Sequence, residues 1–474
     1  MNLPTYLRPQ PYNPIIDVDS YKVPMHLLYR PGIKRVHSFI ESRGGEHADI
    51  MMGPFQPFLY EKLAQPVEDW MIEEAGDTFG RHFGYTSYFN KKMWDEIVNK
   101  HDRMLPLEVR ALPEGLIVPK RTPMITVENT GSAITAPLTT YQETRMLRDF
   151  WPAASIATRV FRMKQRIKPY FDKTSDNGIN PFAILDFCSR GVFGYDHSRL
   201  AGAAFNFMFK GSDNLPGVRF TNYYYQDPMA AFSVAATEHS IASGWVRDDD
   251  SYIDHELAMA EPGSILSLVG DTWNIFEFVK KLMRPDRLDI IRNKKLNVVI
   301  RPDSGDRFMV LPEILRTMCQ AVGTTRNSKG FEVINLNLKA LWADGMDEIT
   351  VTEPFQIAYD MGISADSVFT GSGGGIAAKD MNRDSDRWAM KASDYEMEDG
   401  SHIEVFKDPI TDPGKASKKG RFAVTQEFGN IVTHTRVAGQ EFSNDLLVPR
   451  YLNGSVINAH HLTTDIRPRV DAQL

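Results

Sequence analysis

The glycine-rich run at residues 371–375, Gly-Ser-Gly-Gly-Gly, is the part of this sequence best suited to bind a phosphate group. It follows an apolar segment, residues 367–370, which predicts a buried strand. With almost no side chains in the way, backbone N–H groups can close around an anion at the end of such a strand. A flexible turn explains the glycines alone equally well, but the cations that follow at once favour a phosphate site: Lys379, Arg383 and Lys391.

Arg301 and Asp303 follow a second apolar segment, residues 296–300. An aspartate at this point could accept hydrogen bonds from the two hydroxyls of a ribose, and the arginine adds a forked contact for an anion. The alternative is that Asp303 caps the next helix, a common use of aspartate. The neighbouring arginine favours the ligand site. Asp344, in an Ala-Asp-Gly sequence, has the same two interpretations with less to decide between them.

Phe187 and Arg190 leave a third predicted strand together, and an aromatic face beside a guanidinium suits a flat heterocycle and an anion. Taken alone, Phe187 is a typical core residue. Asp213 could cap a turn or recognise a ligand, and a lone histidine such as His239 is usually structural. Metal-ligand spacings, a G-x-G-x-x-G sequence and a P-loop are all absent from the sequence. Any ATP site must therefore be of another kind.

The middle of the chain alternates short apolar strands with helical stretches, which implies a parallel sheet or a barrel. The predicted strands cover residues 184–187, 265–269, 296–300, 339–342 and 367–370, and helices are expected over 273–282 and 308–321. In a barrel the chemistry takes place at the C-terminal ends of the strands. The recurrence of Arg, Asp, Asp and Gly at these ends is stronger evidence for a site than any single motif.

The two flanks of the chain have a different pattern. The N-terminal part predicts strands at residues 35–41, 107–112 and 124–127 and a helix over 139–171 that is broken near Trp151 and Pro152. The chain after about residue 385 returns to β-like alternation and contains a loop rich in Lys, Pro and Gly. That loop would ordinarily be a solvated surface segment.

The composition is that of a globular protein: 474 residues, 42% hydrophobic and 24% charged, enough for two domains or one elaborated barrel. The formal charge of −7 argues against general affinity for nucleic acid. The two cysteines, Cys188 and Cys319, make no disulfide framework, so we expect a reducing compartment, the cytoplasm. No secretory signal core is evident, and no apolar run approaches the roughly 20 residues that span a bilayer.

Eight motifs occur in an order that resembles the nicotinamide phosphoribosyltransferase family, and the match runs from about residue 13 to about 455. They are Asp-Ser-Tyr-Lys at 19–22, Asp-Phe-Cys-Ser-Arg-Gly at 186–191, Lys-Gly-Ser-Asp at 210–213, Glu-His-Ser at 238–240, Arg-Pro-Asp-Ser-Gly at 301–305, Asp-Gly at 344–345, the glycine run, and the loop at 407–421. The resemblance implies a type II phosphoribosyltransferase fold. Residues 151–384 would form an irregular α/β barrel, residues 1–150 and 385–474 would form a mixed, β-rich domain, and the protein would be a homodimer.

The resemblance also implies a reaction. Nicotinamide and phosphoribosyl pyrophosphate would give nicotinamide mononucleotide and pyrophosphate with Mg²⁺, and ATP hydrolysis would drive the reaction through a phosphorylated histidine at His239. Arg190, His239 and Arg301 would neutralise the leaving pyrophosphate. Asp303 and Asp344 would hold the ribose. The metal ligands are not assigned.

The remaining roles follow from the same resemblance. Nicotinamide would be stacked between Phe187 and Tyr21 near Arg190, with Asp213 accepting a hydrogen bond from the amide group. The 5′-phosphate would be held by a larger set: Gly373, Gly374, Arg383, Lys391 and Arg43. The loop lysines would serve ATP or pyrophosphate, namely Lys407 and Lys415.

The chain departs from the family pattern in two places. Gly-Asp-Thr-Trp-Asn at 270–274 stands where the family has Ser-Asp-Ser-Tyr-Asp, so Asn274 replaces a carboxylate and Gly270 a serine. In the segment Phe-Cys-Ser-Arg at 187–190, Cys188 and Ser189 stand where the family has Gly and Tyr. These changes bear on pyrophosphate or metal binding and on the shape of the base pocket.

Three other functions compete with this interpretation. Nicotinate phosphoribosyltransferase shares the fold and the cosubstrate, but the carboxylate of Asp213 would repel nicotinate. A binding protein that had lost catalysis would not be expected to keep Arg301, Asp303, His239 and the glycine run. A phosphosugar isomerase barrel would explain the phosphate site but not Asp213 together with Phe187.

Overall fold

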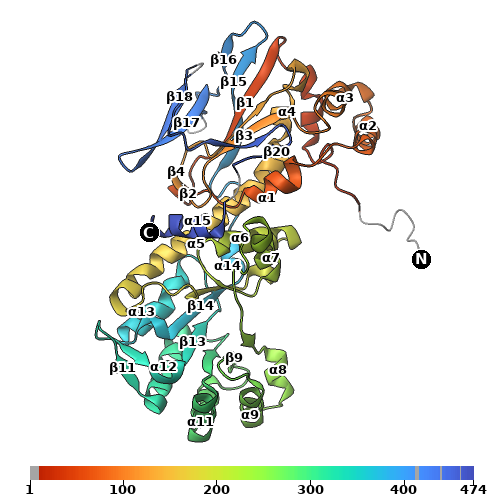
Figure 1. The fold of residues 1–474 in the computed structure, drawn as a ribbon. Coiled ribbons are helices and arrows are strands. Elements are labelled where there is room, and N and C mark those ends of the chain that lie inside the picture. The colour runs from red at the N-terminus through yellow and green to blue at the C-terminus, as the bar shows by residue number, and fades with distance from the viewer. Residues whose placement is uncertain (1–9, 412–415, 438–439, 459–460) are drawn as a thin grey trace, which may run out of the picture. The chain divides into compact units, whose positions relative to one another are not determined.

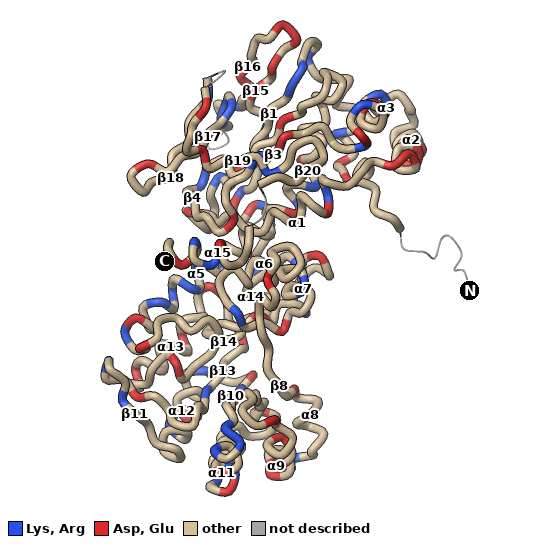
Figure 2. The backbone as a smooth tube through the Cα atoms, in the orientation of Figure 1, with Lys and Arg blue, Asp and Glu red and all other residues tan. Residues whose placement is uncertain are grey.

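The computed structural model describes residues 10–411, 416–437, 440–458 and 461–474, and the chain forms two compact units (Figure 1). Unit 1 comprises Met1–Ser155 and Asn382–His461, and unit 2 comprises Ile156–Met381 and Leu462–Leu474. Acidic and basic residues are interspersed over both units (Figure 2). None of the helices in the described ranges has both the length and the apolar character needed to cross a membrane.

Unit 1 is built on a seven-stranded sheet, antiparallel at every pairing, whose strands come from both ends of the chain. The strand order is β16 (His402–Glu404), β15 (Trp388–Met397), β1 (Ile33–Ser42), β5 (Ile125–Asn129), β3 (Leu107–Ala111), β19 (Val448–Leu452) and β20 (Ser455–Val456). Two smaller sheets pair β2 (Asp49–Met51) with β4 (Ile117–Pro119) and β17 (Arg421–Glu427) with β18 (Asn430–Arg436). The predicted β-rich part, formed by N- and C-terminal segments together, is confirmed.

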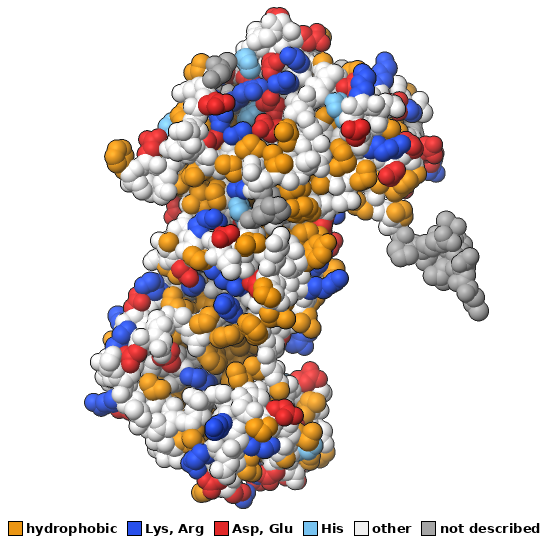
Figure 3. Space-filling view, in the orientation of Figure 1, with side chains coloured by type: hydrophobic (Ala, Val, Ile, Leu, Met, Phe, Trp, Pro, Cys, Tyr) orange, Lys and Arg blue, Asp and Glu red, His pale blue; other side chains and the backbone are white. Residues whose placement is uncertain are grey.

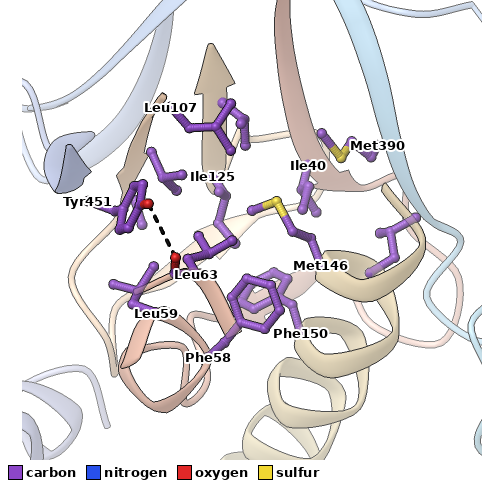
Figure 4. Packing of buried hydrophobic residues seen from close by; sticks show 14 of the residues in the cluster. Ile40, Phe58, Leu59, Leu63, Leu107, Ile125, Met146, Phe150, Met390 and Tyr451 are labelled. Atoms are coloured by element: carbon purple, nitrogen blue, oxygen red, sulfur yellow. Dashed lines mark hydrogen bonds between the residues drawn. The ribbon is translucent and has the colours of Figure 1, made fainter. Parts of the chain in front are cut away.

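One face of this sheet packs on helices to form the core of unit 1. The helices are α1 (Gln56–Phe58), α2 (Asp69–Phe83), α3 (Lys91–Lys100), α4 (Leu138–Tyr141) and the first part of α5 (Glu143–Thr174). Figure 4 shows helix side chains such as Phe58 and Phe150 against the strand residues Ile40 and Ile125, all of them buried. The hydroxyl of the buried Tyr451 donates to the carbonyl of Leu63 at 3.2 Å, so its polar atom is satisfied within the apolar cluster.

The predicted break at Trp151 and Pro152 is wrong, because α5 is helical through both residues. Proline removes one backbone hydrogen bond from a helix interior. Here its neighbours Phe150, Ala153 and Ala154 are all fully or almost fully buried, so packing of a continuous helix outweighs the missing bond.

Unit 2 contains a second seven-stranded sheet, in which every pairing is parallel. Its strand order is β7 (Gly211–Ser212), β6 (Ile184–Asp186), β14 (Val368–Ser372), β13 (Lys339–Trp342), β10 (Asn297–Arg301), β9 (Ile265–Val269) and β8 (Ala235–Ala236). A parallel bridge between Gly211 and Phe232 brings the segment before β8 next to β7, so the sheet curves back on itself. The predicted irregular α/β barrel is confirmed.

Helices follow most of these strands and cover the sheet. They are α6 (Tyr195–Asn206), α7 (Leu215–Tyr224), α8 (His239–Gly244), α9 (Asp249–Met259), α10 (Ile275–Leu282), α11 (Pro285–Lys294), α12 (Arg307–Val322), α13 (Glu353–Asp360), α14 (Gly374–Ala377) and α15 (Thr463–Asp471), with a hairpin of β11 (Thr324–Arg326) and β12 (Glu332–Ile334). Alternate strand residues such as Leu268, Ile300 and Trp342 are fully buried in one apolar cluster with Phe278 and Leu315. The predicted strands and helices of this unit all occur, with bounds within two residues of those expected.

The barrel is less complete at β8, which pairs with β9 over two residues only. Apolar side chains around this edge remain partly exposed, among them Phe232, Val234 and Ile265. Figure 3 shows hydrophobic side chains gathered in a hollow of unit 2. The open edge leaves apolar surface next to the strand ends described below.

Candidate functional site

The carboxyl ends of the parallel strands bring most of the predicted site residues of unit 2 to one edge of the sheet. Phe187 and Arg190 follow β6, Asp213 follows β7, and His239 follows β8. Three further groups complete the row at the ends of β10, β13 and β14: Arg301 with Asp303, Asp344, and Gly373 with Gly374. Since parallel strands all point the same way, these residues share one edge, as expected for a barrel site.

The ends of β6 and β14 pack directly against each other through glycine. The N–H of Phe187 donates to the carbonyl of Ser372 at 3.0 Å. A Cβ on Gly371 would lie 2.2 Å from Cε2 of the Phe187 ring, and one on Gly375 would lie 2.2 Å from the carbonyl oxygen of Met346. These two glycines are therefore needed for close packing.

Gly373 and Gly374, by contrast, are half-buried, and a Cβ on Gly373 would have no neighbour nearer than 3.6 Å. They begin the short helix α14, whose first N–H groups lack partners within a helix. The part of the run at 371–375 that can bind an anion is therefore limited to these two glycines, whereas the sequence predicts the whole run.

Two basic residues of unit 2, Arg159 and Lys379, anchor the glycine loop and the residues that follow it. Nη1 of Arg159 donates to the carbonyls of Gly375 at 3.2 Å and Lys379 at 2.8 Å. The ammonium of Lys379 lies 2.6 Å from Oδ2 of Asp347. Burial acts to raise the pKa of Asp347, but the hydrogen bond from Lys379 and those of the neighbouring loop outweigh it and lower that pKa to about 2. Lys379 is therefore part of an ion pair, which weakens its use as an indicator of phosphate binding.

Asp213 is exposed, and one of its carboxylate oxygens accepts a hydrogen bond from the Ser233 hydroxyl. Its N–H donates to the carbonyl of Asp186 at 3.0 Å. The Asp186 side chain is fully buried and accepts from the N–H of Cys188 at 2.8 Å and the hydroxyl of Ser212 at 3.2 Å. Burial raises the pKa of Asp186 despite these bonds. This acid joins the ends of β6 and β7 and so positions Asp213.

His239, Asp271 and Asp303 form a connected group across three strand ends. Nε2 of His239 lies 2.9 Å from Oδ1 of Asp271. The other oxygen, Oδ2, accepts from the N–H of Asp303 at 3.0 Å and from the hydroxyl of Ser304. A buried carboxylate thus links the histidine to the predicted ribose loop.

Arg301 is anchored to the neighbouring strand end, since its Nη2 donates to the carbonyl of Thr237 at 2.9 Å. Its Nε is buried and makes no hydrogen bond in the described part of the chain. A buried guanidinium N–H without a partner costs free energy unless something supplies an acceptor. An anion such as pyrophosphate would supply one.

The departures from the family pattern have local explanations. Asn274 caps α10, because its Oδ1 accepts from the N–H groups of Phe276 at 3.1 Å and Glu277 at 3.2 Å. A Cβ on Gly270 would lie 2.3 Å from the Phe278 ring, so the glycine makes room for that ring. Cys188 is buried beside Asn214, and burial raises the pKa of its thiol. These contacts make Asn274 a helix cap, Gly270 a packing residue and Cys188 a buried, unreactive thiol.

The predicted phosphate-binding cations Arg43, Arg383 and Lys391 lie near one another in unit 1. Burial lowers the pKa of Lys391, and the charges of Arg43, Lys22 and Arg383 lower it further, while Glu143 opposes them. Nζ of Lys391 is 3.8 Å from Glu143. Nη2 of Arg43 is buried without a hydrogen-bond partner among the described residues. Nε of Arg43 also lies 3.5 Å from Oε1 of Glu41, so these cations lie beside two carboxylates, Glu41 and Glu143.

The predicted site residues are divided between the two units. Tyr21 lies in the 3₁₀ helix Ser20–Leu27 of unit 1, where its side chain is 60% exposed. Lys407 is also exposed in unit 1, and its N–H donates to the Ser417 hydroxyl at 2.9 Å. Lys415 lies outside the described residues. The joining of these residues with Phe187 and with the glycine loop stays a prediction.

Sequence reasoning assigned no role to Asp271, Arg159 or Ser233. Asp271 could have been found by the rule that located the others, because it lies two residues after the apolar segment 265–269. Arg159 lies in the middle of a long helix and Ser233 in a loop before β8. Neither position carries a local signal in the sequence.

Two family models match the chain. The model described as the Nicotinate phosphoribosyltransferase (NAPRTase) family matches residues 182–453, and the model of the N-terminal domain of nicotinamide phosphoribosyltransferase matches residues 13–109. Among curated proteins, the nicotinamide phosphoribosyltransferase of Xanthomonas campestris is 32% identical over 475 residues, which cover 97% of this chain and 98% of the relative. That of Acinetobacter baylyi is 26% identical over 498 residues, covering 98% of each.

Two solved structures support the fold. The nicotinate-nucleotide pyrophosphorylase from Pyrococcus furiosus aligns with a TM-score of 0.62 at 16% identity, over 99% of this chain and 98% of the other. The human nicotinic acid phosphoribosyltransferase aligns with a TM-score of 0.58 at 13% identity, over 96% and 93%. At such low identity the likeness is one of fold.

The packing of the glycine loop leads to a prediction for Gly371→Ala. The new methyl group would overlap the Phe187 ring, so we expect a loss of about 1–3 kcal/mol in the free energy of unfolding of unit 2. Chemical denaturation followed by tryptophan fluorescence measures it. Gly244→Ala, at a position with no atom within 4 Å of the added Cβ, is the matched control and should change little. Equal stability of Gly371→Ala and the parent would contradict the packing argument.

Proposed function

The chain belongs to the nicotinamide phosphoribosyltransferase family of type II phosphoribosyltransferases, and from that premise we propose that it makes nicotinamide mononucleotide and pyrophosphate from nicotinamide and phosphoribosyl pyrophosphate in NAD salvage. The observation that carries the choice of nicotinamide is the exposed carboxylate of Asp213 at the end of β7. Support also comes from the names of the Xanthomonas and Acinetobacter relatives.

The reaction is a displacement at the anomeric carbon of the ribose. The ring nitrogen of nicotinamide forms the new bond to that carbon, and the bond to pyrophosphate breaks with its electron pair leaving on pyrophosphate. Negative charge therefore grows on the leaving group while the sugar becomes cationic. Arg190, His239 and Arg301 would neutralise the pyrophosphate, and the unpartnered buried Nε of Arg301 suits this role.

The ribose and its phosphate need separate contacts. Asp303 and Asp344, at neighbouring strand ends, would accept hydrogen bonds from the ribose hydroxyls. Their carboxylates are also the kind of oxygen donor that Mg²⁺ takes together with substrate phosphates, where the ion would neutralise the pyrophosphate charge. The 5′-phosphate would be bound by the N–H groups of the glycine loop with the cations of unit 1: Gly373, Gly374, Arg43, Arg383 and Lys391.

The base pocket would consist of Phe187 on one face of nicotinamide and Tyr21 on the other, with Arg190 close by. Asp213 would accept from the amide N–H₂, because Ser233 engages one of its oxygens and no hydrogen bond to the other is found among the described residues. A carboxylate facing a nicotinate carboxylate would be repulsive. This argues for nicotinamide over nicotinate, the second candidate substrate.

ATP would act as a second substrate that raises the yield of the reaction. His239 would accept its γ-phosphate, and the loop lysines Lys407 and Lys415 would bind the ATP or pyrophosphate. His239 is suited to this because its side chain is 47% exposed at the strand-end edge. The protein would work as a cytoplasmic homodimer whose two sites each use residues of both subunits.

Asp213→Ala tests the substrate assignment. A charge-assisted hydrogen bond contributes roughly 1.5–3 kcal/mol, so we expect kcat/KM for nicotinamide to fall about 10- to 150-fold. Use of nicotinate should fall much less, or rise. Asp213→Asn is the matched variant, because it keeps an acceptor oxygen but removes the charge, and it should favour nicotinate relative to the parent. Steady-state product analysis with both bases measures this, and equal losses on both substrates would contradict the assignment.

His239→Ala tests the role of ATP. We expect ATP stimulation and ATP hydrolysis to disappear, because no other group would then take the phosphate. His255→Ala, at an exposed histidine of α9 whose ring contacts Trp245, should keep both. Product formation with and without ATP is the measurement. Undiminished ATP stimulation of the His239 variant would exclude this residue as the acceptor.

A shared active site can be tested by mixing two inactive variants, Tyr21→Ala and Asp303→Asn, under subunit exchange. If each site borrows Tyr21 from the partner, one site of a mixed dimer collects both defects and the other has none. Random pairing would then restore about a quarter of parental activity, since half the dimers are mixed and half of their sites are intact. Each variant must first be shown to be dimeric and nearly inactive. No recovery, despite proven exchange, would rule out the shared site.

A further inference from the structure

We propose that Lys418 is a positioning residue of the 5′-phosphate site. By pairing with the buried carboxylate of Glu41, it keeps the guanidinium of Arg43 available for the phosphate. The inference rests on the proposed binding of the 5′-phosphate by the cations of unit 1. It starts from the unequal way in which Glu41 contacts the two cations beside it.

Glu41 pairs closely with one cation and only loosely with the other. Its Oε2 accepts a hydrogen bond from Nζ of Lys418 at 3.0 Å. Its Oε1 lies 3.5 Å from Nε of Arg43, which forms no hydrogen bond. The Glu41 side chain is only 3% exposed, so water competes little for the carboxylate, and a buried carboxylate is costly without a partner. Lys418 is that partner, so the carboxylate does not depend on Arg43.

This pairing leaves one edge of the Arg43 guanidinium free. Nε and Nη2 are both buried, and neither forms a hydrogen bond with a residue in the described ranges. These two nitrogens share one edge of the planar group, and such an edge can bind two oxygens of a phosphate at once. Because buried donors without acceptors cost free energy, an anion bound along this edge would be favoured.

The neighbouring acid, Glu143, has the same arrangement. Nζ of Lys22 donates a hydrogen bond to Oε2 of Glu143, while Nζ of Lys391 lies 3.8 Å from Oε1. Burial lowers the pKa of Lys391, and the charge of Arg43 lowers it further, so these two cations are close in space. Each acid is thus paired with one lysine, and the predicted phosphate-binding cation on its other side is left available.

The sheet of unit 1 fixes the positions of these groups. In the register of β1 and β15, Lys391 is opposite Phe39, two residues before Glu41, so Glu41 and Lys391 are diagonal neighbours on one face. The N–H of Gly420 donates to the carbonyl of Ser393 in β15 at 2.8 Å. This bond anchors the segment that carries the pairing lysine to the same strand.

Loss of Lys418 would change the balance of charges around Glu41. The carboxylate would stay buried with Arg43 as its remaining cationic contact among the described residues. The guanidinium would then turn toward Glu41 with the edge that is otherwise free for the phosphate. Phosphate affinity would fall although Lys418 does not touch the ligand. Direct contact of Lys418 with the phosphate is the alternative, and removal of both charges separates the two.

Titration calorimetry of the full-length protein with ribose 5-phosphate, which has the 5′-phosphate but no pyrophosphate, is the test. We expect Lys418→Met to weaken binding about 10-fold, the effect of losing one charge-assisted hydrogen bond to the ligand. In the double variant Glu41→Gln with Lys418→Met, the neutral amide no longer attracts the guanidinium. Affinity within about threefold of the parent is expected there, a recovery that general damage to the fold would not produce.

A matched control is the neighbouring lysine. Nζ of Lys419 lies 2.7 Å from Glu404, and both side chains are about half exposed, so Lys419→Met should bind ribose 5-phosphate within about twofold of the parent. If Lys418→Met alone does not fold, the double variant still decides, because it contains no unpaired buried carboxylate. Parental affinity of the double variant supports the positioning role, and a loss overturns it.

The outcomes separate this inference from the proposed function. Parental affinity of Lys418→Met, or a double variant as weak as the single one, would overturn the positioning role, and the second result would indicate direct contact with the phosphate. Arg43→Ala tests the 5′-phosphate site itself, where a loss of about 10- to 150-fold is expected. An Arg43→Ala protein that binds like the parent would show that the proposed phosphate site is wrong, and the inference with it.

Discussion

The parallel register of the central strands in unit 2 is the constraint on which the candidate site depends. Arg301 pairs with Val269, Trp342 with Thr370, and Ser372 with Asp186, so the strands end together at one edge. Side chains alternate between the two faces of a strand, and a shift of one residue would exchange Arg301 with the buried Ile300. The apolar cluster on the outer face therefore fixes which polar residues reach the edge.

Most of this sheet could be predicted because strands buried on both faces are continuous apolar runs in the sequence. β9 and β13 have the predicted bounds. The short strands β7 and β8 contain two residues each, too few for any periodicity, and they form through pairing with strands already in place. The uninterrupted helix at Pro152 was missed for a related reason, since the buried neighbours that stabilise it are known only from the fold.

The residues of the candidate site also fall into those that the sequence pattern indicates and those that it does not. Asp303, two residues beyond the end of β10, was singled out from its position, whereas Asp213 follows a strand too short to predict and was assigned its role only through the family resemblance. Arg383 and Lys391 were singled out because they follow the glycine run, whereas Arg43, more than 300 residues away in the sequence, was assigned only through the family resemblance. The glycine run lies at the end of β14, as its position in the sequence predicts, but two of its glycines serve packing against Phe187 and Met346, which no local pattern reveals.

Two buried acids, Asp186 and Asp271, act alike at opposite sides of the barrel edge. Each follows or ends a strand and divides its oxygens between donors from different segments: Cys188 and Ser212 for the first, His239 and the Asp303 loop for the second. A buried carboxylate is costly unless every lone pair finds a donor, so these bonds resist any movement of one strand end relative to its neighbour. Loops at the end of a sheet are usually its most mobile part. Here the same acids that are satisfied by the loops hold them in place. Asp213, proposed to recognise the base, and Asp303, proposed to recognise the ribose, are therefore both positioned before any substrate binds.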